Sequence, residues 1–70
     1  MAKELVNVFP FYEENLINLS SDINHFLYVA GDTIKYIDTS IAYNTDEEKY
    51  VALVSYYVLD DKEFSKRIFK

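Results

Sequence analysis

The sequence predicts an α+β fold in one domain, residues 1–70, with the element order β-α-β-β-α. Residues 12–30 repeat apolar side chains at three- and four-residue steps, which is typical of a helix that buries one face. Two apolar segments, 32–43 and 50–59, enclose a short polar stretch and indicate a β-hairpin. A segment rich in β-branched and aromatic residues, Glu4–Phe9, precedes the helix and predicts the first strand.

The first strand is expected to end at Pro10, because proline cannot donate a hydrogen bond to a neighbouring strand. The apolar stripe of the helix that follows consists of Tyr12, Leu16, Leu19, Ile23, Phe26, Leu27 and Ala30. Glu13 and Glu14 fall in its first turn, where carboxylates interact favourably with the helix dipole, and Gly31 stands just past its end. The solvent-facing side of the helix carries Ser20, Ser21 and Asp22.

Alternation along segment 32–43 divides its side chains between two faces of the sheet. One face receives Ile37, Ile41 and Tyr43, and the other receives Ile34, Tyr36 and Ala42. Residues 44–48 form a polar turn. Segment 50–59 is apolar on both faces, as expected of a central strand.

The long helix connects the first two strands as a crossover. Those strands should therefore run parallel, with a right-handed connection, in a three-stranded mixed sheet. The simplest arrangement places the third strand between them (order 1-3-2), and order 1-2-3 is also compatible with the sequence. Asp60 and Asp61 are candidate N-caps of a short last helix, in which Phe64 and Ile68 lie one turn apart.

One long helix covers only one face of such a sheet, and apolar side chains remain on the other. A chain of 70 residues also buries only about 60% of the surface that its unfolded form exposes. Unless the short last helix covers the second face, we expect a symmetric homodimer. The aromatic residues predicted at its interface are Tyr36, Tyr56 and Tyr57.

The residue types that catalysis or metal binding requires are scarce. The chain has one histidine, His25, one glycine and no cysteine. His25 is interpreted as a residue on the flank of the long helix. The paired carboxylates lie at predicted element ends, and they lack the spacing of a calcium loop. We therefore expect no enzyme activity, no bound metal and no cofactor.

The charge distribution is more informative. Twelve acidic residues face seven basic ones, for a net charge of −5. Such a charge disfavours direct binding to nucleic acids or anionic membranes. The apolar runs are shorter than a membrane span, and the N-terminus lacks the features of a signal peptide, so a soluble cytoplasmic protein is expected.

The predicted topology gathers the acids at the two ends of the fold. Glu13 and Glu14 would share one end with the turn carboxylates Asp46, Glu47 and Glu48. The other end would hold Asp32, Asp60, Asp61 and Glu63. Apart from Asp32, these are the residues predicted to bind a partner, because carboxylates on a rigid body can stand in for phosphates against Lys and Arg side chains.

Two resemblances add to this interpretation. The runs that carry the first are Val6–Phe9, Glu13–Leu16, Ile23–Leu27, Ile34–Ile37 and Tyr50–Tyr56. In these runs, which cover most of the chain, the sequence resembles a small Bacillus sporulation-associated family. In size, acidity and predicted architecture it is similar to the small host-takeover proteins of lytic Bacillus phages.

The second resemblance implies a function. One phage protein of that kind is an acidic, dimeric DNA mimic that inhibits the nucleoid protein HU. By this resemblance, the acids named above would face the DNA-binding surface of HU in the host cytoplasm, with Asp46, Glu47 and Glu48 first among them. Two alternatives remain open: a small homodimeric adaptor that works through its apolar sheet face, and a protein that sequesters nucleotides in a tyrosine-lined pocket at the dimer interface.

Overall fold

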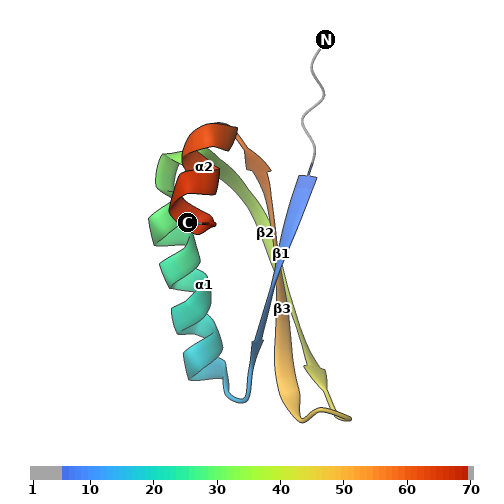
Figure 1. Ribbon diagram of the computed structural model, residues 1–70. Helices are drawn as coiled ribbons and strands as arrows, with labels where there is room; N and C mark the ends of the chain where they lie inside the picture. Colours follow the sequence, from blue (N-terminus) through green and yellow to red (C-terminus); the bar gives the residue numbers. More distant parts are fainter. Residues whose placement is uncertain (1–5, 70) are drawn as a thin grey trace.

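The computed structural model describes residues 6–69 and confirms the order β-α-β-β-α (Figure 1). The strands are β1 (Val6–Glu13), β2 (Ile34–Asn44) and β3 (Lys49–Val58). The helices are α1 (Leu16–Ala30) and α2 (Asp61–Ile68), and a 3-10 turn, η1 (Gly31–Thr33), joins α1 to β2.

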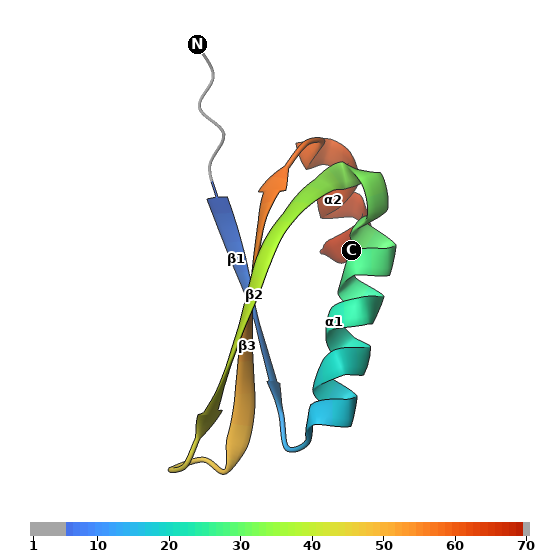
Figure 2. The ribbon, with the colours of Figure 1, turned by 180° about the vertical axis from the view of Figure 1, so that it is seen from behind.

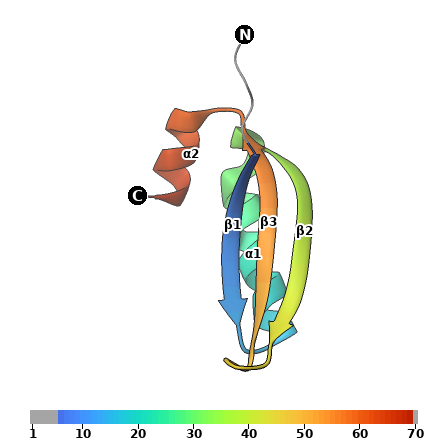
Figure 3. The same ribbon diagram turned by 90° about the vertical axis from the view of Figure 1, so that its right-hand side faces the viewer.

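The sheet has the strand order β1-β3-β2, and both neighbouring pairs are antiparallel. As predicted, β1 and β2 point the same way and β3 is central, and the crossover through α1 is right-handed (Figure 3). The expectation of a mixed sheet is wrong, however. Because β3 lies between β1 and β2, these two strands share no hydrogen bonds, and the sheet contains no parallel pair.

Strand β1 does not end at Pro10 but continues to Glu13, with Pro10 opposite Leu53 of β3. An edge strand bonds to a neighbour on one side only, so a residue without an N–H fits where its nitrogen points away from that neighbour. The predicted strand start at Glu4 lies outside the described residues.

Helix α1 begins four residues later than predicted. Asn15 is its N-cap, and the Asn15 side chain accepts a hydrogen bond from the backbone N–H of Asn18 at 2.8 Å. Glu13 therefore ends β1 and Glu14 precedes the cap, so neither belongs to the first helical turn. Gly31 stands just past the helix, as predicted, with φ +52° and its N–H bonded to the carbonyl of Leu27.

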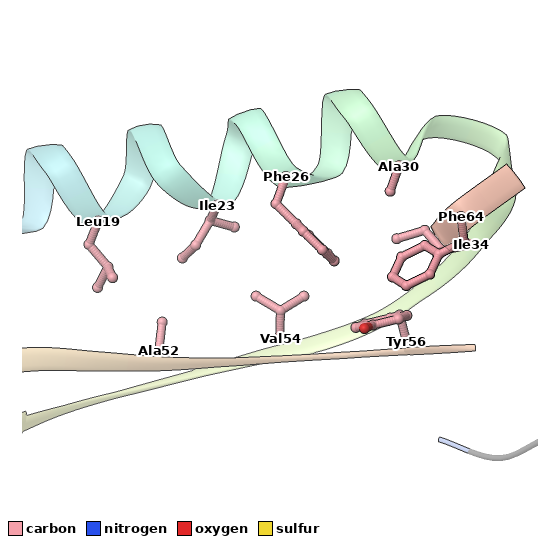
Figure 4. Packing of buried hydrophobic residues seen from close by; sticks show 9 residues of the cluster. All are labelled: Leu19, Ile23, Phe26, Ala30, Ile34, Ala52, Val54, Tyr56 and Phe64. Atoms are coloured by element: carbon pink, nitrogen blue, oxygen red, sulfur yellow. The ribbon is translucent and has the colours of Figure 1, made fainter. Parts of the chain in front are cut away.

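The core lies between α1 and the side of β3 that faces it (Figure 4). Its buried residues are Leu19, Ile23, Phe26, Ala30, Thr33, Ile34, Ala52, Val54, Tyr56 and Phe64. The Phe26 ring is central, with ring centroids of Phe9, Phe11, Tyr56 and Phe64 between 4.8 and 6.4 Å away. The apolar stripe predicted for the helix thus supplies four of the core residues.

A β-bulge at Ile37 changes which face each β2 side chain occupies. Tyr36 pairs with Tyr56, and the next pair is Asp38 with Ser55, so Ile37 is an extra residue. The extra residue reverses the alternation. Ile41 and Tyr43 therefore lie on the same face as Ile34 and Tyr36, the face toward α1, whereas strict alternation had separated them.

Helix α2 packs on the same side of the sheet as α1, as Figures 1 and 2 show. Phe64 contacts the rings of Phe26 and Tyr56, and the Thr33 carbonyl accepts hydrogen bonds from the N–H groups of Leu59 and Asp60. The opposite side of the sheet, the outer face, carries none of the helices formed by residues 6–69 (Figure 3). Its apolar residues are Val6, Val8, Pro10, Tyr12, Ala42, Val51, Leu53 and Tyr57.

Candidate functional site

The β2–β3 turn presents three consecutive carboxylates on a backbone that Asn44 holds in place. The Asn44 side-chain oxygen accepts hydrogen bonds from the N–H groups of Asp46 (3.0 Å) and Glu47 (3.2 Å), and its amide donates to Oε2 of Glu47 (3.5 Å). Glu48 completes the turn with φ +53°, in the left-handed region. Asp46, Glu47 and Glu48 are all exposed, so the turn directs three acids to solvent.

A second pair of acids lies where β1 meets α1. A hydrogen bond between the Glu13 and Asp22 side chains raises the pKa of Glu13, and desolvation and the charges of Asp22 and Glu14 raise it further. Lys49 acts in the opposite direction but does not outweigh them. Asp22 was predicted to face solvent on the far side of α1. It is instead half-buried and next to Glu13, a contact that helical periodicity alone did not reveal.

These two groups of acids share one end of the molecule. The register places Glu13 beside Tyr50 and Asn44 beside Lys49, so β1 ends next to the turn (Figures 1 and 2). We call them the hairpin-end cluster: Glu13, Glu14, Asp22, Asp46, Glu47 and Glu48. The predicted gathering of Glu13 and Glu14 with the turn carboxylates is therefore present, and Asp22 joins it.

No ion pair among residues 6–69 neutralises the hairpin-end cluster. Among residues 6–69, the ion pairs are those of Arg67 with Asp32 (3.4 Å) and with Glu63 (3.8 Å), both far from the turn. Lys49 is the basic residue at the hairpin end, and it forms no ion pair there. The cluster therefore projects an unpaired negative field into solvent.

Most of the acids at the opposite end cap a helix or form ion pairs. Asp60 is the N-cap of α2, and its side chain accepts a hydrogen bond from the N–H of Glu63 at 3.1 Å. Asp32 and Glu63 hold Arg67, whose Nη1 also donates to the Ala30 carbonyl at 3.3 Å. Of the residues predicted to bind a partner at this end, Asp61 alone has no side-chain partner among residues 6–69.

The three tyrosines predicted for a dimer interface occupy three different environments. Tyr56 is 4% exposed and packs against Phe26 and Phe64, so its assignment to an interface is wrong. Burial raises the pKa of its hydroxyl. Tyr36 lies on the helix-facing side at the β2 edge, where its hydroxyl hydrogen-bonds to that of Thr39 at 2.6 Å. Tyr57 lies on the outer face.

A groove of about 420 Å³ opens between β1, α1 and α2. The rings of Phe9, Phe11 and Phe26 line it together with Val29 and Ile68, and its polar lining residues are Ser21, Asp22, His25 and Arg67. His25 is exposed on α1, as expected of a helix-flank residue. Ser21 and His25 both lie in this lining, but no hydrogen bond joins them. Among residues 6–69, no three His, Cys, Asp or Glu side chains come close enough to hold a metal ion.

Comparison with known proteins adds no assignment. No family model, no curated protein and no solved structure matches the chain. Within residues 6–69, neither helix combines the length and apolarity needed to cross a membrane.

Proposed function

We propose that the protein is a homodimeric, non-enzymatic DNA mimic that occupies the DNA-binding surface of a bacterial nucleoid-associated protein, HU by preference. The hairpin-end cluster is the surface that stands in for DNA phosphates. Lys and Arg side chains of the partner would pair with its carboxylates, as they otherwise pair with phosphate oxygens.

The observation that carries this proposal is the contrast between the two ends. Arg67 neutralises acids at the α2 end. Within residues 6–69, the six acids of the hairpin-end cluster have Lys49 as the one base beside them, and they form no ion pair. Repulsion among these carboxylates lowers the stability of the free protein. Binding to a cationic surface removes that repulsion, because the partner's positive charges pair with the carboxylates.

The choice of HU rests on the resemblance to phage host-takeover proteins and on the chemistry of the partner. A nucleoid protein binds DNA mainly through phosphates, without strict sequence readout. An acidic competitor therefore needs only a rigid array of charges, and it needs no base-like groups. The turn, with two backbone N–H groups held by Asn44, supplies that rigidity.

The test is competition between this protein and a labelled DNA duplex for HU. We expect displacement of the duplex in proportion to added protein at low salt. Displacement should weaken steeply as salt rises, since charges on exposed surfaces are screened beyond about 8 Å at physiological ionic strength. Absence of displacement at low salt would refute HU as the partner.

A second candidate function follows from the uncovered outer face. An apolar sheet surface is typical of an adaptor that binds another protein. Its complexes should survive high salt, which distinguishes it from the mimic in the same competition series. The nucleotide-sequestering alternative, which requires a tyrosine-lined pocket at the dimer interface, has less support. The three tyrosines expected there do not share a surface, because Tyr56 is buried in the core, Tyr36 lies on the helix-facing side of the sheet and Tyr57 lies on the outer face.

A further inference from the structure

We propose that two copies of this chain pack their outer faces together, about a two-fold axis that lies between the two sheets and runs across the strands. This assigns the interface and its symmetry, which the proposed function leaves open, and it does not depend on HU. In this arrangement β1 of one copy lies over β1 of the other, and β3 over β3, with strand directions reversed.

The apolar side chains of the outer face are concentrated on two of its three strands. On β1 and β3 they alternate in register, so that Val8 lies beside Ser55, and Pro10 beside Leu53. No helix or loop among residues 6–69 covers this strip (Figure 3). Four of its residues are therefore between 42% and 57% exposed: Val6, Val8, Tyr12 and Leu53. Isolated exposed apolar residues are ordinary, but a continuous strip on a rigid sheet marks an interface.

The outer face also carries no excess negative charge among residues 6–69. Its charged residues are Lys35, Asp38 and Lys49, so it carries one net positive charge in a chain with a net charge of −5. Two copies can therefore approach through this face without the repulsion that their acidic ends would produce. An acidic partner protein would also be compatible with the charge of this face. The apolar strip favours a second copy of the chain, because the second copy supplies a matching apolar strip.

Both edges of the sheet resist pairing, which leaves the face as the route to association. Pro10 removes a donor from the edge of β1, and the bulge at Ile37 disrupts the edge of β2. Proline and bulges on edge strands are devices that prevent strand addition. A dimer that extends the sheet from edge to edge is therefore disfavoured.

The outer face is apolar on β1 and β3 but polar on β2, and this difference determines the direction of the axis. An axis parallel to the strands would lay the apolar β1 strip over β2, whose outward residues include Lys35, Asp38, Ser40 and Asn44. It would also bring the two hairpin-end clusters side by side. An axis across the strands instead places apolar strip on apolar strip and sends the two acidic clusters to opposite ends.

The area suits a dimer of moderate affinity. The three strands have 8, 11 and 10 residues. At about 3.3 Å per residue and about 4.8 Å between strands, they give a flat footprint of roughly 450 Å² per copy. Projecting side chains enlarge the accessible surface, so pairing two faces removes on the order of 1,000 Å² in total, near the lower limit for a specific interface. We therefore expect dissociation in the micromolar range.

The interface is tested with Leu53→Asp, at the centre of the outer face. Ile17→Asp is the matched control, because Ile17 is an 81% exposed apolar residue on α1, away from the sheet face. In sedimentation equilibrium, the parent and Ile17→Asp should be dimers at tens of micromolar, and Leu53→Asp should be a folded monomer by circular dichroism. If Leu53→Asp does not fold, Val8→Lys on edge strand β1 replaces it. A monomeric parent, or a dimer that persists in whichever folded variant is used, Leu53→Asp or Val8→Lys, overturns the proposal.

The axis is tested by a distance between the two turns. The chain has no cysteine, so Thr45→Cys introduces one spin-label site per copy at the hairpin tip. An axis across the strands predicts a label-to-label distance on the order of the 42 Å length of one copy. An axis along the strands predicts roughly 10–20 Å, since packed sheets are about 10 Å apart. The short distance in a face-packed dimer would overturn the proposed symmetry.

Discussion

The side chains of Glu13, at the end of β1, and Asp22, in the second turn of α1, lie close enough to interact although both are acids. They can share a hydrogen bond only when one of the two carboxyls carries a proton. The consequence is a raised pKa for Glu13, and a pair that repels once both groups are ionised. The interaction between Glu13 and Asp22 therefore stabilises the hairpin end, which we propose as the partner-binding surface, less at neutral pH than at acidic pH.

This relationship predicts a pH dependence of stability. The folded state holds the Glu13 proton more tightly than the unfolded state does, where the ordinary value is 4.5. The contribution of Glu13 to the free energy of unfolding is therefore present below that pH and is lost as pH rises through the raised pKa. We expect the free energy of unfolding, measured with urea, to fall less between pH 4 and pH 7 for Glu13→Gln and for Asp22→Asn than for the parent. Identical profiles for all three proteins would show that the pair does not titrate.

The core predicts large losses at two positions on α1. Ile23→Ala and Phe26→Ala should each lower the free energy of unfolding by roughly 2–5 kcal/mol, with Phe26 toward the upper value because its ring meets four others. His25→Ala, between them in sequence but exposed, should change it by less than about 0.5 kcal/mol. Thermal or urea unfolding measures all three. A large loss of HU competition by folded His25→Ala would overturn the non-enzymatic, charge-based interpretation of this chain.

The two acids at the start of α2 should behave differently. Asp60→Ala removes the cap that accepts from the N–H of Glu63 and should cost about 0.5–2 kcal/mol. Asp61→Ala removes an exposed carboxylate without that bond and should cost a few tenths of a kcal/mol through the helix dipole. Equal losses for the two variants in urea unfolding would show that the cap contributes nothing.

Glu48 offers a way to separate stability from binding. It adopts φ +53°, which a glutamate tolerates poorly and an asparagine more readily. Glu48→Asn should therefore raise the free energy of unfolding by up to about 1 kcal/mol, whereas Glu48→Gln, which removes the same charge and keeps the strain, should leave it unchanged. Both should weaken displacement of DNA from HU to a similar extent. If only one of them weakens it, the charge of Glu48 is not what the partner recognises.

The fold was predictable where local patterns decide it. The three- and four-residue repeat identified Leu19, Ile23, Phe26 and Ala30 as the buried stripe of α1, and the two-sided apolar character of 50–59 identified the central strand. The start of α1 was misplaced because Tyr12 continues the helical period while in fact it belongs to β1. Pro10 could not reveal that β1 continues, since tolerance of proline depends on the strand being at an edge.

The candidate site was predictable only in part, for a similar reason. The chain order alone was enough to place Glu13 and Glu14 near the turn carboxylates. Tyr56 was misassigned because the two faces of an apolar central strand look alike in sequence, and only packing against Phe26 distinguishes them. Asp22 was missed because its contact with Glu13 joins two elements and has no periodic signature.

The most direct measurement of the central proposal is the displacement of a labelled duplex from HU by the parent and by a variant with Asp46, Glu47 and Glu48 all changed to Lys. All three residues are exposed, so the variant should keep the parent's circular dichroism spectrum and nearly its stability. We expect it to lose competition by roughly tenfold or more at low salt, because three attractions become repulsions. Glu47→Lys alone should weaken competition more than its matched control Asp61→Lys at the opposite end. A folded triple variant that displaces DNA as well as the parent would contradict the assignment of the hairpin-end cluster as the DNA-mimicking surface.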